Sequence, residues 1–262
     1  MFKDLLRIGR GNSIGLLSAN TIYFIAAIVM TIDHAKHFGI LTGVWPNILG
    51  RIALPIFIYF IIEGYHKTHN LYKYATRLFI VAIIAEVPFN IMCANSLYSL
   101  NYQNTIFELL ISLMAVIAVQ NLKHANICNM QLIFNVFVIF SALILSEALN
   151  FDYGIHGVLL AIAFEILYNS SIEKIGVAFS IWLIFGILYS STYTVSVEWL
   201  NTSLTVQSFS LLAIIPLWLY NGTKGFNLTV GDCSKIDLFQ YFKYLFYPAH
   251  LIVLYIIKLA IT

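Results

Sequence analysis

Residues 74–92 read YATRLFIVAIIAEVPFNIM, an almost unbroken apolar run that carries Arg77 near its start and Glu86 near its end. A helix needs about 20 mostly apolar residues to cross the hydrocarbon core of a membrane. This run meets that requirement. It therefore predicts a membrane-spanning helix with ionisable side chains at membrane depth.

Similar runs recur along the whole chain. Of 262 residues, 60% are hydrophobic and 10% are charged, against roughly 25% charged in an ordinary soluble domain, and the mean hydropathy is +0.86. No polar stretch is long enough to form a second core. We therefore expect one all-α polytopic membrane domain over residues 1–262, with about nine transmembrane helices and a range of roughly eight to ten. The expected spans are Ile14–Ile32, Ile48–Ile62, Tyr74–Met92, Ile106–Val119, Ile133–Leu149, Ile155–Leu167, Ile175–Leu188, Leu204–Leu219 and Tyr241–Ile261.

The distribution of Lys and Arg predicts the orientation, because these residues accumulate on the cytoplasmic side of membrane proteins. With a cytoplasmic N-terminus and nine crossings, most of the 14 basic residues, including Lys3, Arg10 and Lys235, fall inside. Those placed outside are Lys36, Arg51 and Lys258. We expect a multi-pass protein of the inner (cytoplasmic) membrane, N-in and C-out. A net charge of +2 from scattered residues gives no reason to expect a nucleic-acid partner.

Ionisable groups inside the spans are the main functional signal, since each costs several kcal/mol unless it faces the protein interior. The group expected near the outer side contains Asp33, His34, Arg51, Glu86, Asn90, Asn104, Glu108, Asp152 and His156. Three pairs in it are four residues apart and share a helix face: 86 with 90, 104 with 108, and 152 with 156. Any single pair is explained by packing between helices. A polar cluster contributed by six spans at one level favours a site.

The group expected near the inner side surrounds a short turn between two spans. It contains Glu63, His66, Lys67, His69, Lys73 and Arg77. Cations here suit an anionic cofactor, but the cytoplasmic preference of Lys and Arg explains them equally well. Pro55 and Pro88 lie in the adjoining spans, where each removes a backbone hydrogen bond and favours a kink. His250 lies near the middle of the last span.

Other chemistry has little support in the sequence. The seven histidines have no carboxylate partners at metal-ligand spacing, and the three cysteines form no CxxC pair. We expect no metal. Nucleotide-binding, serine hydrolase and zinc protease motifs are not found in the sequence.

Several segments carry a resemblance to a known family. They are residues 28–34 (IVMTIDH), 50–57 (GRIALPIF), 63–68 (EGYHKT), 74–78 (YATRL), 85–89 (AEVPF), 103–104 (QN), 153–157 (YGIHG) and 246–251 (FYPAHL). Taken together, they closely resemble the TraX family over nearly the whole chain. The residues that match the family's pattern are Asp33, His34, Arg51, Glu63, Arg77, Glu86, Asn104 and His250.

The resemblance implies acyl transfer. TraX proteins are similar to the conjugative pilin N-acetylase and to a wider group of transmembrane acyltransferases, in which acyl-CoA enters from the cytoplasm and the acceptor is modified on the far side. It predicts acetyl-CoA as donor, an acceptor peptide or saccharide, and membrane lipid as partners. The catalytic set is expected to be His34, Asp33, Arg51, Glu86 and Asn104. The donor-binding set is expected to be Glu63, His66, Lys67, Lys73, Arg77 and His250.

Within this hypothesis, His34 is the general base, since imidazole titrates near neutral pH. Asp33 either orients His34 or pairs with Arg51, and both alternatives stay open because adjacent helical residues point about 100° apart. Arg51 or Asn104 would stabilise the oxyanion. Two rival functions also fit a membrane protein with buried polar groups: a proton-coupled transporter and a non-catalytic membrane assembly factor.

Overall fold

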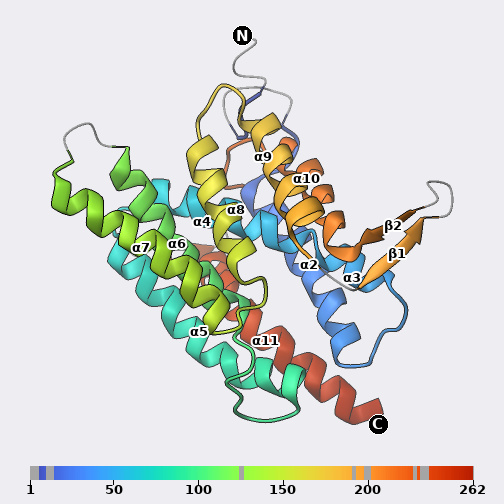
Figure 1. Cartoon of the computed structure of the whole chain (residues 1–262). Coiled ribbons are helices and arrows are strands. Elements are labelled where there is room, and N and C mark those ends of the chain that lie inside the picture. Colours follow the sequence, from blue (N-terminus) through green and yellow to red (C-terminus); the bar gives the residue numbers. More distant parts are fainter. Residues whose placement is uncertain are drawn as a thin grey trace.

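The computed structural model is mostly helical and describes residues 6–9, 15–123, 127–190, 193–197, 202–226, 229–230 and 236–261. Figure 1 shows the helices gathered into one bundle. The long helices are α2 (Ala19–His37), α4 (Ala53–Lys67), α5 (Leu71–Ala94), α6 (Thr105–Leu122), α7 (Asn129–Ala148), α8 (Ile155–Leu167) and α11 (Leu238–Ile261). The shorter ones are α3 (Trp45–Gly50), α9 (Glu173–Ile181) and α10 (Ile214–Trp218), with a π-helical segment η1 (Trp182–Leu188) and a 3-10 segment η3 (Val206–Ala213).

Each expected span coincides largely with helix. Five stretches within the described residues are long and apolar enough to cross a membrane: Trp45–Lys67, Leu71–Ala94, Thr105–Leu122, Asn129–Ala148 and Phe239–Ile261. Two shorter apolar helices are Ile155–Leu167 and Val206–Trp218. A polytopic helical membrane protein is thus confirmed, whereas nine crossings and the N-in, C-out orientation remain predictions.

The second expected span is broken into two helices. Between α3 and α4, Arg51 and Ile52 leave the regular helix, and Pro55 falls in the first turn of α4. A first-turn residue has no intrahelical acceptor for its N–H, so Pro55 removes no hydrogen bond there. Pro88, in contrast, lies well inside α5. The break places Arg51 at the end of α3, where its side chain turns toward α2.

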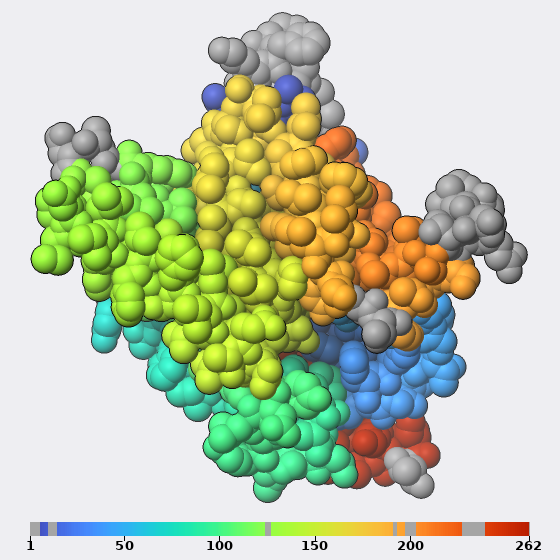
Figure 2. Space-filling view, in the orientation of Figure 1, coloured from blue at the N-terminus to red at the C-terminus, as the bar shows by residue number. Residues whose placement is uncertain are grey.

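Packing divides the helices into a buried centre and a lipid-facing flank. α6 contacts α5, α7 and α8, and α11 packs against α5 and α2. Figure 2 shows α7 covering one flank of the molecule. Its outward side chains are large and apolar, among them Ile133, Phe134, Phe137, Phe140 and Ile144. Such a face suits contact with lipid tails, and no water is needed to satisfy its backbone because all bonds are made within the helix.

Two short hairpins interrupt the otherwise helical fold, and the all-α prediction did not include them. β1 (Thr194–Val197) pairs antiparallel with β2 (Thr202–Thr205), so that residue 194 faces residue 205. This hairpin projects from the bundle beside α3 (Figure 1). β3 (Thr229–Val230) pairs with β4 (Ile236–Asp237) just before α11.

The described N-terminal residues and the end of α11 lie at opposite ends of the molecule (Figure 1). Residues 6–9 pack beside α9, where the Lys174 amide donates to the Leu6 carbonyl at 2.8 Å. The cations Lys3, Arg10 and Lys235, which entered the orientation argument, lie outside the described residues, as does Ile14 at the start of the first expected span.

Candidate functional site

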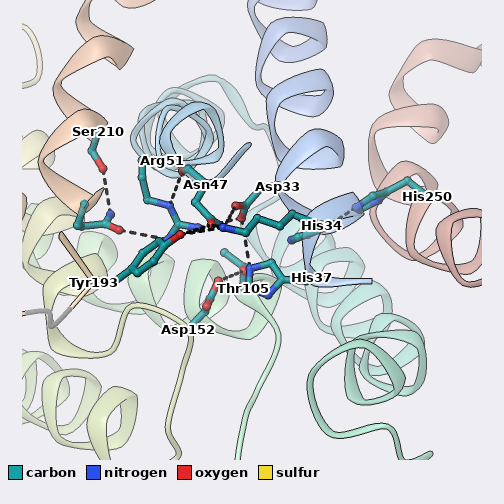
Figure 3. A network of polar contacts seen from close by, with 12 residues as sticks. Asp33, His34, His37, Asn47, Arg51, Thr105, Asp152, Tyr193, Ser210 and His250 are labelled. Carbon is teal, nitrogen blue, oxygen red and sulfur yellow. Dashed lines mark hydrogen bonds and ion pairs between the residues drawn. The ribbon is translucent and has the colours of Figure 1, made fainter. Parts of the chain in front are cut away.

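A buried ion pair joins α2 to the α3–α4 break. Arg51 Nη2 donates to Asp33 Oδ2 at 2.8 Å, and Asn47 Nδ2 donates to Asp33 Oδ1 at 2.6 Å. Figure 3 shows these side chains converging. The close approach needs Gly50, because a Cβ there would lie 2.4 Å from the Cβ of Asp33. Of the two partners left open for Asp33, the structure selects Arg51 rather than His34.

Arg51 is held from several sides. Its Nη1 donates to Gln207 Oε1 at 3.2 Å, its Nε donates to the Asn47 carbonyl at 3.1 Å, and its guanidinium lies 5.7 Å from the ring centre of Tyr153. Gln207 in turn donates to Ser210 Oγ at 2.9 Å. A guanidinium fixed by this many partners keeps its position without a ligand.

The polar network extends to the β1–β2 hairpin. Lys36 hydrogen-bonds to Asn47 and donates to the Tyr193 hydroxyl at 2.8 Å. Tyr193 immediately precedes β1. His37 Nε2 also lies 3.8 Å from Asp33 Oδ2. The hairpin is thus attached to the same network as the ion pair.

His34 points away from the ion pair and toward α11. Its Nδ1 lies 2.7 Å from His250 Nε2, and both side chains are buried. His250 Nδ1 donates to the Phe246 carbonyl at 2.9 Å. Tyr247 packs edge-on against both imidazoles. The sequence placed His250 in the donor-binding set; the structure places it directly against the proposed base, on the opposite side from Asp33 (Figure 3).

Glu86 and Asn104 bind each other. The Asn104 side-chain amide donates to Glu86 and also to the Ala82 carbonyl at 2.9 Å, while its Oδ1 accepts from the Ile106 amide at 3.0 Å and caps α6. Asn90 donates to Glu86 at 3.3 Å. Since both donors and the acceptor of Asn104 are engaged and the residue is fully buried, this pair joins α5 to α6. It does not present a donor to the His34 side of the site.

The other residues of the outer group hold the loop before α8. Glu108 accepts from the Tyr153 amide at 3.0 Å, and Thr105 donates to Asp152 at 3.0 Å. His156 packs against the Tyr189 ring. The structure therefore divides the expected outer cluster into the ion-pair network, the histidine pair, and these contacts between helices.

A cavity of about 580 Å³ opens at the turn between α4 and α5 and extends to Met30 and Tyr247, beside the histidine pair; His34 and His250 themselves do not line it. It is bounded by α2, α4, α5, α6 and α11 and by the segment after α10. On α2 the lining runs from Ala19 to Met30, which is about 16 Å at 1.5 Å per residue. Met30 lies one turn before His34, and Tyr247, which touches both histidines, also lines the cavity.

The mouth of this cavity gathers basic side chains. Its lining includes Lys67, His69, Arg77, Lys224 and Lys243. The last two were not expected to contribute, because they lie far from the turn between α4 and α5 in sequence and reach it only through the fold. The deeper lining is mostly apolar, with Ile61, Leu78, Val81, Ile106 and Leu109.

The expected donor-binding residues separate into two groups. Glu63, Lys67 and Arg77 line the cavity. His66 instead contacts the buried Glu165 on α8, with Nε2 to Oε2 at 2.9 Å. Lys73 is exposed and is not part of the lining.

Glu63 is held in the cavity wall by two donors. Lys67 Nζ and the Tyr220 hydroxyl each donate to its Oε1 at 2.7 Å. Burial and the adjacent Glu63 carboxylate raise the pKa of Tyr220, which follows α10 in the connecting segment, so its hydroxyl stays protonated and continues to donate. Arg77 donates from Nε to the Tyr244 hydroxyl at 3.1 Å. Within the residues that the structure describes, no group of three or more His, Cys, Asp or Glu side chains has the spacing of a metal site.

Comparisons with known proteins found one family model and one similar protein that match most of the chain. The model of the family described as "TraX protein" matches residues 18–258. A protein of Dichelobacter nodosus named "Probable fimbrial assembly protein FimC, serogroup H1" is 25% identical over 250 residues, which cover 90% of this chain and 94% of that protein. No solved structure matches the chain.

Proposed function

This chain belongs to the TraX family, and from that premise we propose that it is a transmembrane acetyltransferase. It moves an acetyl group from cytoplasmic acetyl-CoA to an acceptor amine or hydroxyl at the outer side of the membrane. The similar Dichelobacter protein is named for fimbrial assembly. A fimbrial or pilin-like subunit is accordingly the acceptor that we favour over a saccharide.

The cavity that runs from the cationic mouth to Met30 and Tyr247, beside the histidine pair, is the observation that carries this proposal. Its volume of about 580 Å³ falls in the usual range of small-molecule sites, roughly 300–1,000 Å³. One end offers cations, and the other end is lined by Met30 and by Tyr247, whose ring packs against His34. A donor with a charged head and a long, thin arm bearing a reactive group at its tip suits this shape.

The donor's two chemical parts match the two parts of the lining. Lys67, Arg77 and Lys243 surround the mouth, and ammonium and guanidinium groups are the usual partners of phosphate oxygens. The lining beyond them is apolar and includes Ile61 and Leu109. It suits a pantetheine arm, whose few amides leave most of its length apolar.

The reaction requires a base next to the end of the arm. His34 takes the proton from the acceptor amine or hydroxyl while the acceptor's nitrogen or oxygen attacks the thioester carbonyl. The new carbon–nitrogen or carbon–oxygen bond replaces the carbon–sulfur bond, and CoA leaves as a thiolate that takes up a proton to become the thiol. Two residues were expected to stabilise the oxyanion, Arg51 and Asn104. Because Asn104 is fully engaged elsewhere, we assign this role to the Arg51 guanidinium, which is fixed beside Asp33.

The proposal is tested with purified protein in lipid vesicles, labelled acetyl-CoA and a pilin-type peptide with a free N-terminus. Wild-type protein is expected to transfer label, and His34→Ala is expected to lower the rate by about 10² to 10⁴ while CoA binding is retained. His156→Ala is the matched control, because His156 packs on Tyr189 outside the cavity. Wild-type turnover by His34→Ala would remove His34 from the base role.

A non-catalytic assembly factor is the rival that the name of the Dichelobacter protein supports. It predicts no saturable binding of CoA and no transfer to any acceptor. A transporter predicts flux of solute across the vesicle membrane with no acyl donor present. Either result would overturn acetyl transfer by this chain.

A further inference from the structure

The hydrogen bonds around His250 determine where its proton lies. Its Nδ1 is 2.9 Å from the carbonyl oxygen of Phe246. A carbonyl oxygen only accepts hydrogen bonds, so His250 Nδ1 carries the hydrogen. In the neutral ring the other nitrogen, Nε2, is then an acceptor.

This acceptor faces His34. The distance from His250 Nε2 to His34 Nδ1 is 2.7 Å. The two ring planes are nearly parallel, with an interplanar angle of 13°, and their centroids are 5.0 Å apart. With only 2.7 Å between the two nitrogens, both nitrogens lie on the line between the centroids, so the contact runs along the in-plane lone pair. His34 must therefore donate from Nδ1, and neutral His34 keeps its own lone pair on Nε2.

We propose that His250 is a positioning residue that holds His34 in the tautomer with hydrogen on Nδ1 and leaves His34 Nε2 as the proton acceptor. The inference rests on the proposed acetyl transfer for its catalytic meaning. When His34 Nε2 takes the acceptor's proton, the Nδ1 hydrogen bond to His250 remains in place. His250 therefore stabilises the imidazolium without itself being protonated.

Geometry excludes the more common arrangement, in which a carboxylate orients the base. Asp33 is adjacent in sequence, but its two oxygens accept from Asn47 and Arg51. Among the described residues, His250 is the hydrogen-bond partner of the His34 side chain.

The α11 helix keeps His250 in place. Phe246 lies one turn earlier on the same face, and its ring stacks on His250 with an interplanar angle of 10°. Tyr247 packs against the edge of both imidazoles. A ring held on two sides loses little freedom when it binds His34, which is what a positioning residue requires.

A kinetic test separates positioning from general packing. His250→Leu removes the acceptor and is expected to lower kcat by about 10²-fold, with the KM for acetyl-CoA unchanged. His250→Gln offers an amide oxygen that can accept from His34 Nδ1. Its kcat is expected to be at least ten times that of His250→Leu. Equal loss in both variants, in proportion to a fall in Tm, would overturn the inference.

A spectroscopic test does not depend on turnover. Protein labelled with ¹⁵N-histidine is measured by NMR at about pH 8, above the ordinary pKa of imidazole, and the His34 signals are assigned with His34→Gln. We expect hydrogen on Nδ1 in wild type and in His250→Gln, and its loss from Nδ1 in His250→Leu. Hydrogen on His34 Nε2 in wild type would overturn the inference. Failure of wild-type protein to transfer acetyl groups would instead overturn the proposed function.

Discussion

The two ends of the candidate site are built in different ways. At the His34 end, the polar side chains are buried and are joined by contacts between segments far apart in the chain: Asp33 to Arg51, and His34 to His250. At the mouth, the cations are partly exposed, and the Glu63–Lys67 pair is formed within one helix turn. The first arrangement holds the His34 and Arg51 side chains in fixed positions, whereas the second supplies positive charge for an anionic ligand.

This difference predicts how each end responds to substitution. A buried group with several partners has few alternatives, so its loss leaves the partner uncompensated. The Lys67 side chain is 56% exposed, and the other basic side chains at the mouth, Arg77 among them, carry the same charge. We expect large effects on kcat and folding at the His34 end and modest, additive effects on donor KM at the mouth.

The largest effect is expected from breaking the Asp33–Arg51 pair. Asp33→Ala leaves the guanidinium without its carboxylate, and removing one partner of a buried pair typically costs about 3–5 kcal/mol. Acetyl transfer should fall with it, because Arg51 loses its fixed position. Thermal unfolding in detergent and turnover in vesicles measure the two effects.

A double-substitution cycle provides the control. Asp33→Asn combined with Arg51→Gln leaves no unpaired charge, so the double variant should be more stable than the sum of the single losses predicts. Strict additivity would contradict a direct coupling between the two side chains.

The next effect is expected from Gly50→Ala. The added methyl group would meet the Asp33 side chain at 2.4–2.5 Å, so α3 must move away from α2, and overpacking of this kind costs about 1–3 kcal/mol. We expect lower kcat with little change in donor KM. Gly186→Ala is a matched control, since the nearest contact there would be 3.5 Å. Equal behaviour of the two variants would contradict the account of the α2–α3 contact.

A smaller effect is expected from Lys67→Gln combined with Arg77→Gln. Both residues line the mouth, and exposed charge pairs contribute up to about 1 kcal/mol each, so the KM for acetyl-CoA should rise roughly 5- to 30-fold with kcat nearly unchanged. Kinetics at low and high salt measure this, and the wild-type KM should itself rise with salt. If the double variant changes only the expression level or the topology and leaves the KM for acetyl-CoA unchanged, these cations determine the orientation in the membrane and do not bind the donor.

The smallest effect is expected from Lys73→Gln. This substitution removes the same charge from the same turn, but Lys73 is exposed and does not line the cavity. The KM of this variant for acetyl-CoA should stay within about twofold of the wild-type value. A rise equal to that of the Lys67 and Arg77 variant would mean that net charge, not the cavity lining, determines donor binding.

The helical regions were predictable from hydropathy because each apolar run must satisfy its own backbone in lipid. The bounds of α8, Ile155–Leu167, agree with the expected span. The break after Arg51 was not predicted, since the apolar run from Ile48 to Ile62 continues through it. The β1–β2 hairpin was also missed, because its residues lie between and at the edge of two apolar runs.

The candidate site was only partly predictable. Asp33, His34 and Arg51 were identified as polar residues at membrane depth, and the structure joins Asp33 to Arg51. Residue type gave no way to tell that Asn104 caps a helix or that His66 contacts Glu165 on α8.

Other contributions depend on contacts across the fold. The bond from His250 to His34 spans 216 positions of the chain, and Gln207 reaches Arg51 across 156. Lys224 and Lys243 join the mouth in the same way. No spacing rule within one helix identifies such pairs, although a polar residue within an apolar helix, such as Asn47 or Gln207, was a signal available in the sequence.

Calorimetric titration with CoA tests the central claim most directly, because it asks whether the cavity between the cationic mouth and His34 holds the donor. Wild-type protein and Lys73→Gln should bind CoA at one saturable site with the same affinity, and the Lys67→Gln, Arg77→Gln variant should bind it roughly 5- to 30-fold more weakly. No saturable binding by wild-type protein, or equal affinity in all three, would contradict the claim.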